Sequence, residues 1–378
     1  MNVIAKEQKQ RKRNYGIDLL RIVSMLLIPV LHILGHGGLI DAVQVGSVNY
    51  KIVWFMEIAA YCGVNCYALI SGYVGYSSKY KYTNIIMLYL QVAFYSIIIF
   101  GVFYLVKPEL LIPQDLFSML LPVSAKQYWF FTAYFCLALF MPFLNMILDN
   151  IDRDMGIKMF ITILVLFVIL PTTFHRDIFY TGDGYSALWL AMLYLIGGCI
   201  NKFDIGKHGK TARYLIGYFI CITITWIFKV QRVRVFTESL FAASSEGDFF
   251  VSYTSPTILF AGIMLVIGFR NLNIREATTK IISFFTPLTF GVYLIHENPI
   301  IRRWIITENF RGYADKNALL LMMVVVGTAF VIWLTCSLID KIRLCFFKAI
   351  KIQVVCTYIE RIVTNVGEKF WGNKEKEV

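Results

Sequence analysis

Two ionisable residues, Arg21 and His32, lie inside the first long apolar stretch of the chain, and Asp18 precedes Arg21 by three positions. Eleven residues of α-helix rotate about 20° net and rise roughly 16 Å, so the two side chains would project from one helix face. Histidine exchanges protons near neutral pH, and the planar guanidinium of arginine pairs with phosphate or carboxylate. The spacing predicts a chemically active helix face. The alternatives are that Arg21 snorkels to lipid headgroups and that His32 bonds a carbonyl.

The composition indicates an integral membrane protein. Hydrophobic residues make up 58% of the sequence, including 31 Phe and 22 Tyr, well above the roughly 45–50% usual in soluble domains. A basic run at 6–13 leads into the first apolar stretch, and no small-residue cleavage site follows, so we expect this stretch to remain as a signal anchor. The eight cysteines show no metal-ligand spacing except Cys62 and Cys66, which we interpret as small core residues; no metal site is expected.

A search for apolar windows long enough to cross a bilayer predicts an all-α, polytopic membrane helix bundle with about ten transmembrane helices. Of the 36 Lys and Arg residues, 24 fall in the two tails and the even-numbered loops, and 11 fall in the odd-numbered loops. Positive charge concentrates on the cytoplasmic side, so both termini are expected there, and the +12 net charge requires no nucleic acid. The windows are 16–36, 50–75, 83–106, 128–148, 157–175, 186–201, 213–228, 255–270, 280–301 and 317–340.

The domain organisation follows from these windows. No internal repeat or Pro-rich linker divides the sequence, so residues 1–340 are expected to form one ten-helix transmembrane domain. In the remainder, 341–378, cations alternate with aromatic residues, and Glu360 and Arg361 interrupt the following apolar run. An eleventh span is therefore disfavoured, and we predict a cytoplasmic, basic amphipathic tail on the inner leaflet.

Four segments carry a family resemblance, in order along the chain. The first is 15–32, where ten residues separate Arg21 from His32, and the second is the Ser-Gly-Tyr at 71–73. The third combines Tyr-Trp-Phe-Phe at 128–131 with Pro-Phe-Leu-Asn at 142–145, and the fourth is Tyr-Leu-Ile-His at 293–296. Together they resemble the acyltransferase-3 family of membrane O-acyltransferases, whose hallmark is a basic residue, ten residues and then His.

This resemblance implies transfer of an acyl group, most often acetyl, from cytoplasmic acyl-CoA to a hydroxyl of an extracytoplasmic or lipid-linked cell-surface glycan. Acetyl-CoA would be the donor substrate, with no bound cofactor, and the glycan and membrane lipids would be the other partners. The resemblance also implies a multi-pass protein of the cell membrane, expected to be a bacterial plasma membrane. Members often carry an Arg-x-x-Arg pair after the second span, where this chain has Lys79 and Lys81 instead.

The chemistry of such a transfer can be assigned to particular side chains. A sugar hydroxyl needs a base within hydrogen-bond reach, and we assign that role to His32, with a transient acyl-imidazole as the alternative. Arg21 would pair with Asp18 and meet a CoA phosphate or polarise the thioester carbonyl. The expected donor-binding residues come from the second span and the following loop: Asn65, Ser71, Gly72, Lys79 and Lys81. Plain helix packing is an equal alternative for the three in the second span.

The acceptor site is expected at the opposite, outer side. Tyr128 and Trp129 begin the fourth window, where they would stack on a sugar face or belong to an aromatic belt. His296 and Glu297 lie in the last turns of the ninth window, where they would bind the acceptor or satisfy carbonyls at a helix end. Glu57 is interpreted as an interfacial residue, with orientation of a histidine as the alternative.

The sequence features distinguish three classes of function. An O-acyltransferase needs a donor site, an acceptor site and a histidine between them, and the chain offers candidates for each. A membrane glycan polymerase or ligase would typically have a long outer loop rich in Arg and His, but the longest outer loop, 229–254, is of modest length. A glycan or lipid transporter would show inverted repeats or paired broken helices, which the sequence lacks. The acyltransferase is therefore predicted, with the other two classes as alternatives.

Overall fold

A computed structural model describes residues 13–76, 78, 80–232 and 247–371. These residues form helices and no β-strand, which confirms the all-α prediction. The α-helices are α1 (Tyr15–Leu34), α2 (Leu39–Ala42), α3 (Val48–Gly75), α4 (Tyr82–Val106), α5 (Pro113–Leu120), α6 (Trp129–Asn150), α7 (Arg153–Leu164), α8 (Leu170–Phe174), α9 (Ala187–Lys202), α10 (Thr211–Val230), α12 (Pro256–Arg270), α13 (Glu276–Phe285), α14 (Thr289–His296), α15 (Pro299–Ile301), α16 (Ala318–Ala349) and α17 (Ile352–Trp371).

The described helices agree with the predicted windows one by one. Eight spans are long and apolar enough to cross a membrane, and α9 and α12 are shorter apolar helices. Two of the eight are composite. A π-helical turn, Val165–Ile169, joins α7 to α8, and a short 3-10 turn, Thr286–Leu288, joins α13 to α14. A polytopic membrane bundle is therefore confirmed, while ten complete spans and cytoplasmic termini stay predictions.

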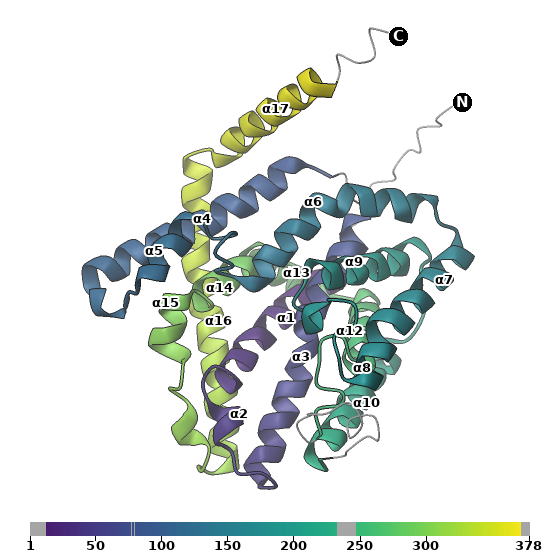
Figure 1. The fold of residues 1–378 in the computed structure, drawn as a ribbon, viewed down its shortest axis with the longest axis vertical. Coiled ribbons are helices and arrows are strands. Elements are labelled where there is room, and N and C mark those ends of the chain that lie inside the picture. The colour runs from purple at the N-terminus through teal and green to yellow at the C-terminus, as the bar shows by residue number, and fades with distance from the viewer. Residues whose placement is uncertain (1–12, 77, 79, 233–246, 372–378) are drawn as a thin grey trace.

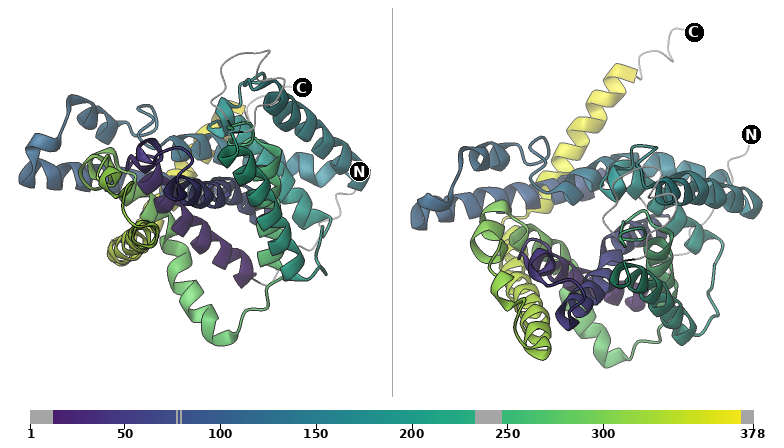
Figure 2. Two further views of the ribbon diagram at one scale, coloured as in Figure 1. Left: turned by 90° about the horizontal axis from the view of Figure 1, so that it is seen from below. Right: turned by 60° about the horizontal axis from the view of Figure 1, so that its bottom comes forward.

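The first and third helices form the centre of the bundle (Figure 1). They pack against each other along their lengths, with α16 beside α1 and with α9, α10 and α12 beside α3. In the two further views, α4 and α6 run across one end of this bundle rather than along it (Figure 2). This arrangement places the last turns of α1 against α14.

Side-chain caps set where several of these helices begin. Asn14 accepts a hydrogen bond from the backbone N–H of Ile17 at the start of α1, and Ser47 accepts one from Tyr50 at the start of α3. Ser186 and Ser255 cap α9 and α12 in the same way. A cap satisfies a backbone donor that has no partner within the helix, which stabilises the helix by about 1 kcal/mol.

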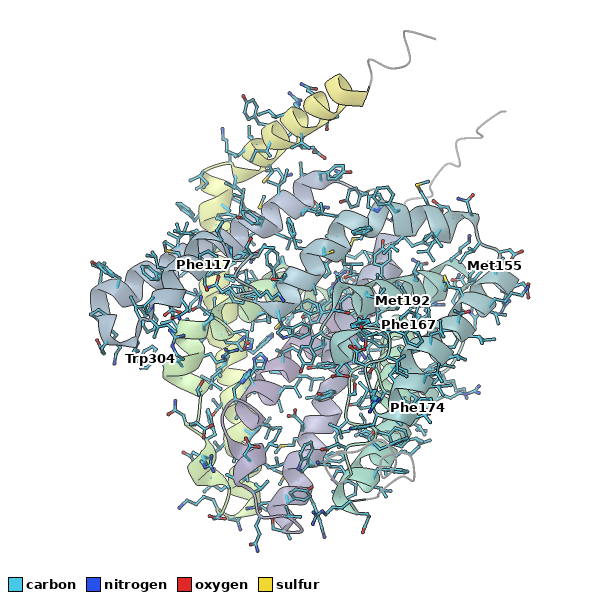
Figure 3. All side chains as sticks on the ribbon, viewed as in Figure 1. Phe117, Met155, Phe167, Phe174, Met192 and Trp304 are labelled. Carbon is cyan, nitrogen blue, oxygen red and sulfur yellow. The ribbon has the colours of Figure 1, made fainter. Side chains whose placement is uncertain are left out.

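Large apolar side chains cover much of the periphery (Figure 3). Phe117, Met155 and Trp304 lie on the outside of the bundle with 53%, 51% and 46% of their surface exposed. A water-soluble protein rarely exposes so many large apolar side chains, because contact between apolar surface and water is unfavourable. A lipid bilayer removes that cost, in agreement with the membrane assignment.

Glycines allow α3 and α9 to approach closely. A Cβ atom added to Gly72 would lie 1.9 Å from the carbonyl oxygen of Tyr194, and one added to Gly197 would lie 2.0 Å from that of Leu69. The two glycines therefore face each other's helix backbone, a geometry that small residues permit in membrane bundles. This contact matches the packing alternative for Gly72.

The C-terminal region continues the last span as a helix. Helix α16 extends to Ala349, past residue 340, and α17 follows after a short break. Val354, Tyr358 and Ile362 recur every four residues on α17 and are all exposed, so this helix carries an apolar stripe. The basic amphipathic tail on the inner leaflet stays a prediction.

The close contact at Gly72 predicts a site-specific loss of stability. Gly72→Ala should lower the free energy of unfolding by about 1–3 kcal/mol, because the added methyl group forces α3 and α9 apart. The measurement is thermal unfolding of the purified protein in detergent. Gly101→Ala is the matched control, since a Cβ there meets nothing within 4 Å. Equal unfolding temperatures for the two variants would contradict the packing role.

Candidate functional site

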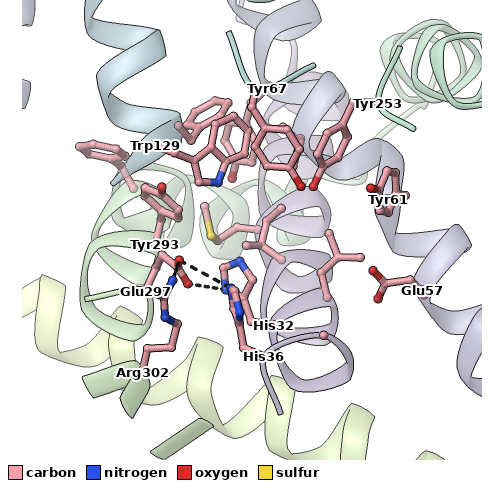
Figure 4. Close-up of a pocket in the computed structure, with 18 residues that line it drawn as sticks. His32, His36, Glu57, Tyr61, Tyr67, Trp129, Tyr253, Tyr293, Glu297 and Arg302 are labelled. Carbon is pink, nitrogen blue, oxygen red and sulfur yellow. Dashed lines mark hydrogen bonds and ion pairs between the residues drawn. The ribbon is translucent and has the colours of Figure 1, made fainter. Parts of the chain in front are cut away.

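The last turns of α1 and α14 bring two histidines and a carboxylate together. His32 lies near the C-terminal end of α1, and His296 and Glu297 lie at the C-terminal end of α14. Nδ1 of His32 is 3.0 Å from Nε2 of His296. The same nitrogen is 2.9 Å from Oε2 of Glu297 (Figure 4). The predicted catalytic residue therefore contacts two predicted acceptor residues across more than 260 positions of sequence.

The hydrogen bonds of His296 determine which nitrogen of His32 carries the proton. Nδ1 of His296 lies 2.6 Å from the carbonyl oxygen of Val292, which only accepts, so this nitrogen must donate. In the neutral ring Nε2 of His296 is then an acceptor, and Nδ1 of His32 donates to it. The proton on Nδ1 leaves Nε2 of His32 with the lone pair, and no described residue bonds that nitrogen. In this tautomer Nε2 of His32 can accept a proton.

Glu297 supports this arrangement from a buried position. Its side chain is only 5% exposed, and it forms an ion pair with Arg302 in addition to its contact with His32. Nε2 of His36 lies 4.0 Å from Oε1 of the same carboxylate. A carboxylate beside the N–H edge of an imidazole holds the ring orientation and stabilises the imidazolium once the ring accepts a proton.

Tyr128 positions this network instead of lining the space beside it. Its hydroxyl donates to the carbonyl of Leu294 in α14 and accepts from the amide of Asn298, which follows Glu297. Tyr128 is 1% exposed and is not among the cavity-lining residues described below. Its location therefore gives no support to the predicted acceptor contact and indicates a role in holding the end of α14.

A cavity of about 290 Å³, named here the His32 cavity, opens beside the histidines. Trp129, a predicted acceptor residue, lines it together with Glu57, His36 and Arg302. Most of the remaining lining is apolar or aromatic: Met25, Ile28, Leu31, Gly35, Tyr61, Val64, Tyr67, Phe130, Tyr185, Tyr253, Phe290 and Tyr293. A mostly apolar pocket with a few convergent polar groups is typical of a ligand site.

A second cavity has a volume of about 240 Å³ and lies beside the N-terminal half of α1. It is named here the Arg21 cavity. Ser71 and Lys81 line it with Arg21, so three of the residues expected on the donor side share one space. Nη1 of Arg21 is 3.1 Å from Oδ1 of Asp18, and Asp18 also pairs with Arg13 at 2.5 Å. The predicted pairing of Arg21 with Asp18 is confirmed.

Two expected donor residues lie elsewhere, and a third lies outside the described residues. The amide of Asn65 is fully buried, donates to the carbonyl of Tyr253 and accepts from the indole of Trp189, so it joins helices and loops. Gly72 faces the backbone of α9. Neither lines the Arg21 cavity, so their positions support helix packing. Lys79 is not among the residues that the structure describes.

An aromatic wall separates the two cavities. Tyr67 lines the His32 cavity, and its hydroxyl donates to the carbonyl of Arg21 at 2.8 Å. Tyr134 lines the Arg21 cavity, and its hydroxyl lies 3.3 Å from that of Ser71. Phe130 contacts both rings: it meets Tyr67 edge to face, with centroids 6.1 Å apart, and stacks on Tyr134, with centroids 5.9 Å apart. These three rings therefore lie between residues of the two cavities.

A third cavity, of about 430 Å³ and named here the Asp183 cavity, adjoins the first. Tyr61 and Tyr185 line both spaces. Its other walls are more polar and include Asp177 and Asp183 in the segment between α8 and α9. Burial raises the pKa of Asp183 above its ordinary value, and repulsion from Asp177 raises it further.

The histidine and carboxylate cluster also offers ligand atoms for a cation. One atom each from His32, His296 and Glu297 all lie within 4.8 Å of one another. Two nitrogens bound to one tetrahedral zinc ion would be roughly 3.3 Å apart, whereas the observed 3.0 Å is a hydrogen-bond distance. Arg302 already pairs with the carboxylate. In the described structure the two histidines are hydrogen-bonded to each other.

Sequence reasoning missed several residues of this site. His36 and Arg302 were visible as polar residues near the ends of apolar windows, but nothing in the sequence indicated that both lie beside Glu297. Tyr61, Tyr185 and Tyr253 carried no signal, because 22 tyrosines are spread over the chain. Only the fold shows which of them meet at one cavity.

Comparison with known proteins identifies the family of the chain. A family model described as an acyltransferase domain matches residues 14–340, which include both the His32 network and the Arg21 cavity. No curated protein and no solved structure matches the chain. The match covers nearly the whole described bundle, and the chain therefore belongs to the acyltransferase-3 family of membrane acyltransferases.

Proposed function

We propose that this membrane acyltransferase moves an acyl group, acetyl being the first candidate, from cytoplasmic acyl-CoA to a hydroxyl of an extracytoplasmic or lipid-linked glycan. The observation that carries the proposal is the contact pattern of His32, from which its tautomer is inferred. Its Nδ1 bonds His296 and lies 2.9 Å from Oε2 of Glu297, its Nε2 is bonded to no described residue, and the residue lines a cavity. General-base catalysis on a hydroxyl requires such a nitrogen within reach of the proton.

The chemical step follows from this geometry. Nε2 of His32 accepts the proton of the acceptor hydroxyl as its oxygen attacks the thioester carbonyl. The carbon–sulfur bond then breaks, and the proton passes from the imidazolium to the departing thiolate. Glu297 stabilises the imidazolium between these two events, because the carboxylate lies 2.9 Å from Nδ1. A transient acyl-imidazole is the alternative route for the same residue.

The donor would enter near the N-terminal half of α1, where Arg21 lies. The Arg21 cavity contains two cations, Arg21 and Lys81, suited to the phosphates of CoA, and hydroxyl groups suited to polar contacts. Arg21 and His32 are eleven residues apart on one helix, roughly 16 Å along its axis. A long flexible thioester arm would bridge that distance, passing Tyr67, Phe130 and Tyr134.

Removal of the proposed base should abolish transfer. His32→Ala is expected to lower the rate of radiolabel transfer from acetyl-CoA to isolated glycan by about 10²–10⁴-fold, the usual contribution of a positioned base. Membranes that contain the variant are assayed beside membranes that contain the wild-type protein. Thermal unfolding of both proteins shows whether the fold is retained.

His208→Ala is the matched control for this variant, because His208 is exposed on the loop between α9 and α10. It should transfer label at the wild-type rate. Wild-type activity in His32→Ala would exclude His32 as the base. Absence of transfer by the wild-type protein with every acyl-CoA and glycan supplied would overturn the proposed function itself.

The proposed direction of transfer requires a particular topology. Ser78, beside the Arg21 cavity, should face the cytoplasm, and Asp183, beside the third cavity, should face outward. After replacement of the eight native cysteines, Ser78→Cys should resist a membrane-impermeant thiol reagent added to intact cells, whereas Asp183→Cys should react. Labelling of Ser78→Cys with protection of Asp183→Cys would reverse the topology and place the proposed donor site on the wrong side.

A further inference from the structure

Glu57 is a buried carboxylate that the proposed chemistry does not use. Glu57 lies in α3, and only 7% of its surface is exposed. Its Oε2 atom is buried and has no hydrogen-bond partner among the described residues. A carboxylate removed from water without a partner is costly, so such a group is retained where a ligand completes its hydrogen bonds.

Four aromatic rings gather at the same part of the His32 cavity. Tyr61 and Tyr253 are stacked, with ring centroids 4.4 Å apart, and Tyr185 lies 5.1 Å from Tyr253. Trp129 completes the group, with its ring 4.5 Å from that of Tyr185. Aromatic faces of this kind offer an apolar platform with a negative centre, which attracts C–H edges and cations and disfavours anions.

The carboxylate and the rings face the same space as the proposed base. Glu57 and Tyr61 lie on the opposite side of the cavity from Glu297 and Arg302, with His32 between them (Figure 4). The cavity volume of about 290 Å³ lies at the lower end of ligand pockets. A small ligand bound there would lie in the space that Glu57 and His32 both line.

We propose that Glu57, Tyr61, Trp129, Tyr185 and Tyr253 form the acceptor-sugar subsite, here called the Glu57 subsite. One sugar ring lies against the aromatic faces, and a hydroxyl or amino group of that ring donates a hydrogen bond to Glu57. This assignment rests on the proposed acyl transfer for the identity of the ligand as the acceptor. The class of ligand expected in this subsite is a neutral or amino sugar without an anionic substituent at this position.

The neighbouring cavity supports the same class of ligand. Tyr61 and Tyr185 also line the Asp183 cavity, so a glycan whose terminal ring occupies the Glu57 subsite continues into that space. Its wall contains three carboxylates and one arginine, together with His175: Asp177, Asp183, Asp248 and Arg176. The carboxylates outnumber the guanidinium, repel an anionic polymer and accept hydrogen bonds from hydroxyls, which again favours a neutral or amino-substituted chain.

The first test measures binding without any transfer. Purified protein is titrated with glucose, galactose, N-acetylglucosamine, glucosamine and glucuronate, and binding is read from the rise in unfolding temperature. At least one neutral or amino sugar should bind, and glucuronate should bind more weakly. Glu57→Gln should weaken binding of the preferred sugar by about 10- to 100-fold, since a donating amide group replaces one of the two carboxyl oxygens.

Matched variants separate a binding role from a structural one. Glu109→Gln, at an exposed position, should bind as the wild type does. Trp129→Leu removes one ring, leaves Glu57 in place and should also weaken binding. If Glu57→Gln unfolds, Trp129→Leu carries the test. Unchanged affinity in both variants, binding by glucuronate as tight as by the neutral sugars, or no binding by any of the five sugars would overturn the assignment.

The transfer assay then distinguishes this inference from the proposed function. In Glu57→Gln the KM for the glycan should rise about 10-fold or more while the KM for acetyl-CoA stays unchanged. An active Glu57→Gln enzyme with both KM values unchanged would overturn the Glu57 subsite and leave the acyltransferase proposal standing. Sugar binding by a wild-type protein that transfers no acyl group would overturn the acyltransferase proposal and leave the sugar-binding role of the Glu57 subsite standing.

Discussion

The structure depends on one chain of hydrogen bonds that runs from the carbonyl of Val292 through His296 to His32. A backbone carbonyl only accepts, so it dictates the proton position on His296 and, through that ring, on His32. Glu297 reinforces the same proton position from the side and is itself held by Arg302. The free nitrogen of His32 is therefore a consequence of how α14 ends and packs against α1.

The membrane explains why this network is concentrated at one place. Polar and charged side chains within apolar spans cost several kcal/mol unless they are paired or face a cavity. Arg21 meets both conditions through Asp18 and the Arg21 cavity, and His32 meets them through Glu297 and its own cavity. Two polar sites on one helix, separated by an aromatic wall, suit a reaction whose two substrates approach from opposite sides.

Local patterns predicted most of the architecture and part of the site. Hydrophobic windows located the helices, because length and hydropathy are properties of contiguous sequence. The helix face shared by Arg21 and His32 followed from spacing alone. Contacts between distant segments could not be predicted, because they depend on helix packing: Asn65 and Gly72 serve that packing. The pairing of His32 with Glu297 likewise depends on α14 ending beside α1, which no local signal specifies.

The central claim, that Nδ1 of His32 carries the proton, can be measured directly. The chain has five histidines, so nitrogen-15 NMR of histidine-labelled protein in lipid gives few signals, and comparison with His32→Ala assigns those of His32. At about pH 8.5, where ordinary histidines are neutral, the spectrum should show a protonated Nδ1 and a bare Nε2 for His32. A proton on Nε2, with Nδ1 bare, would contradict the hydrogen-bond network and remove the base on which the proposed reaction depends.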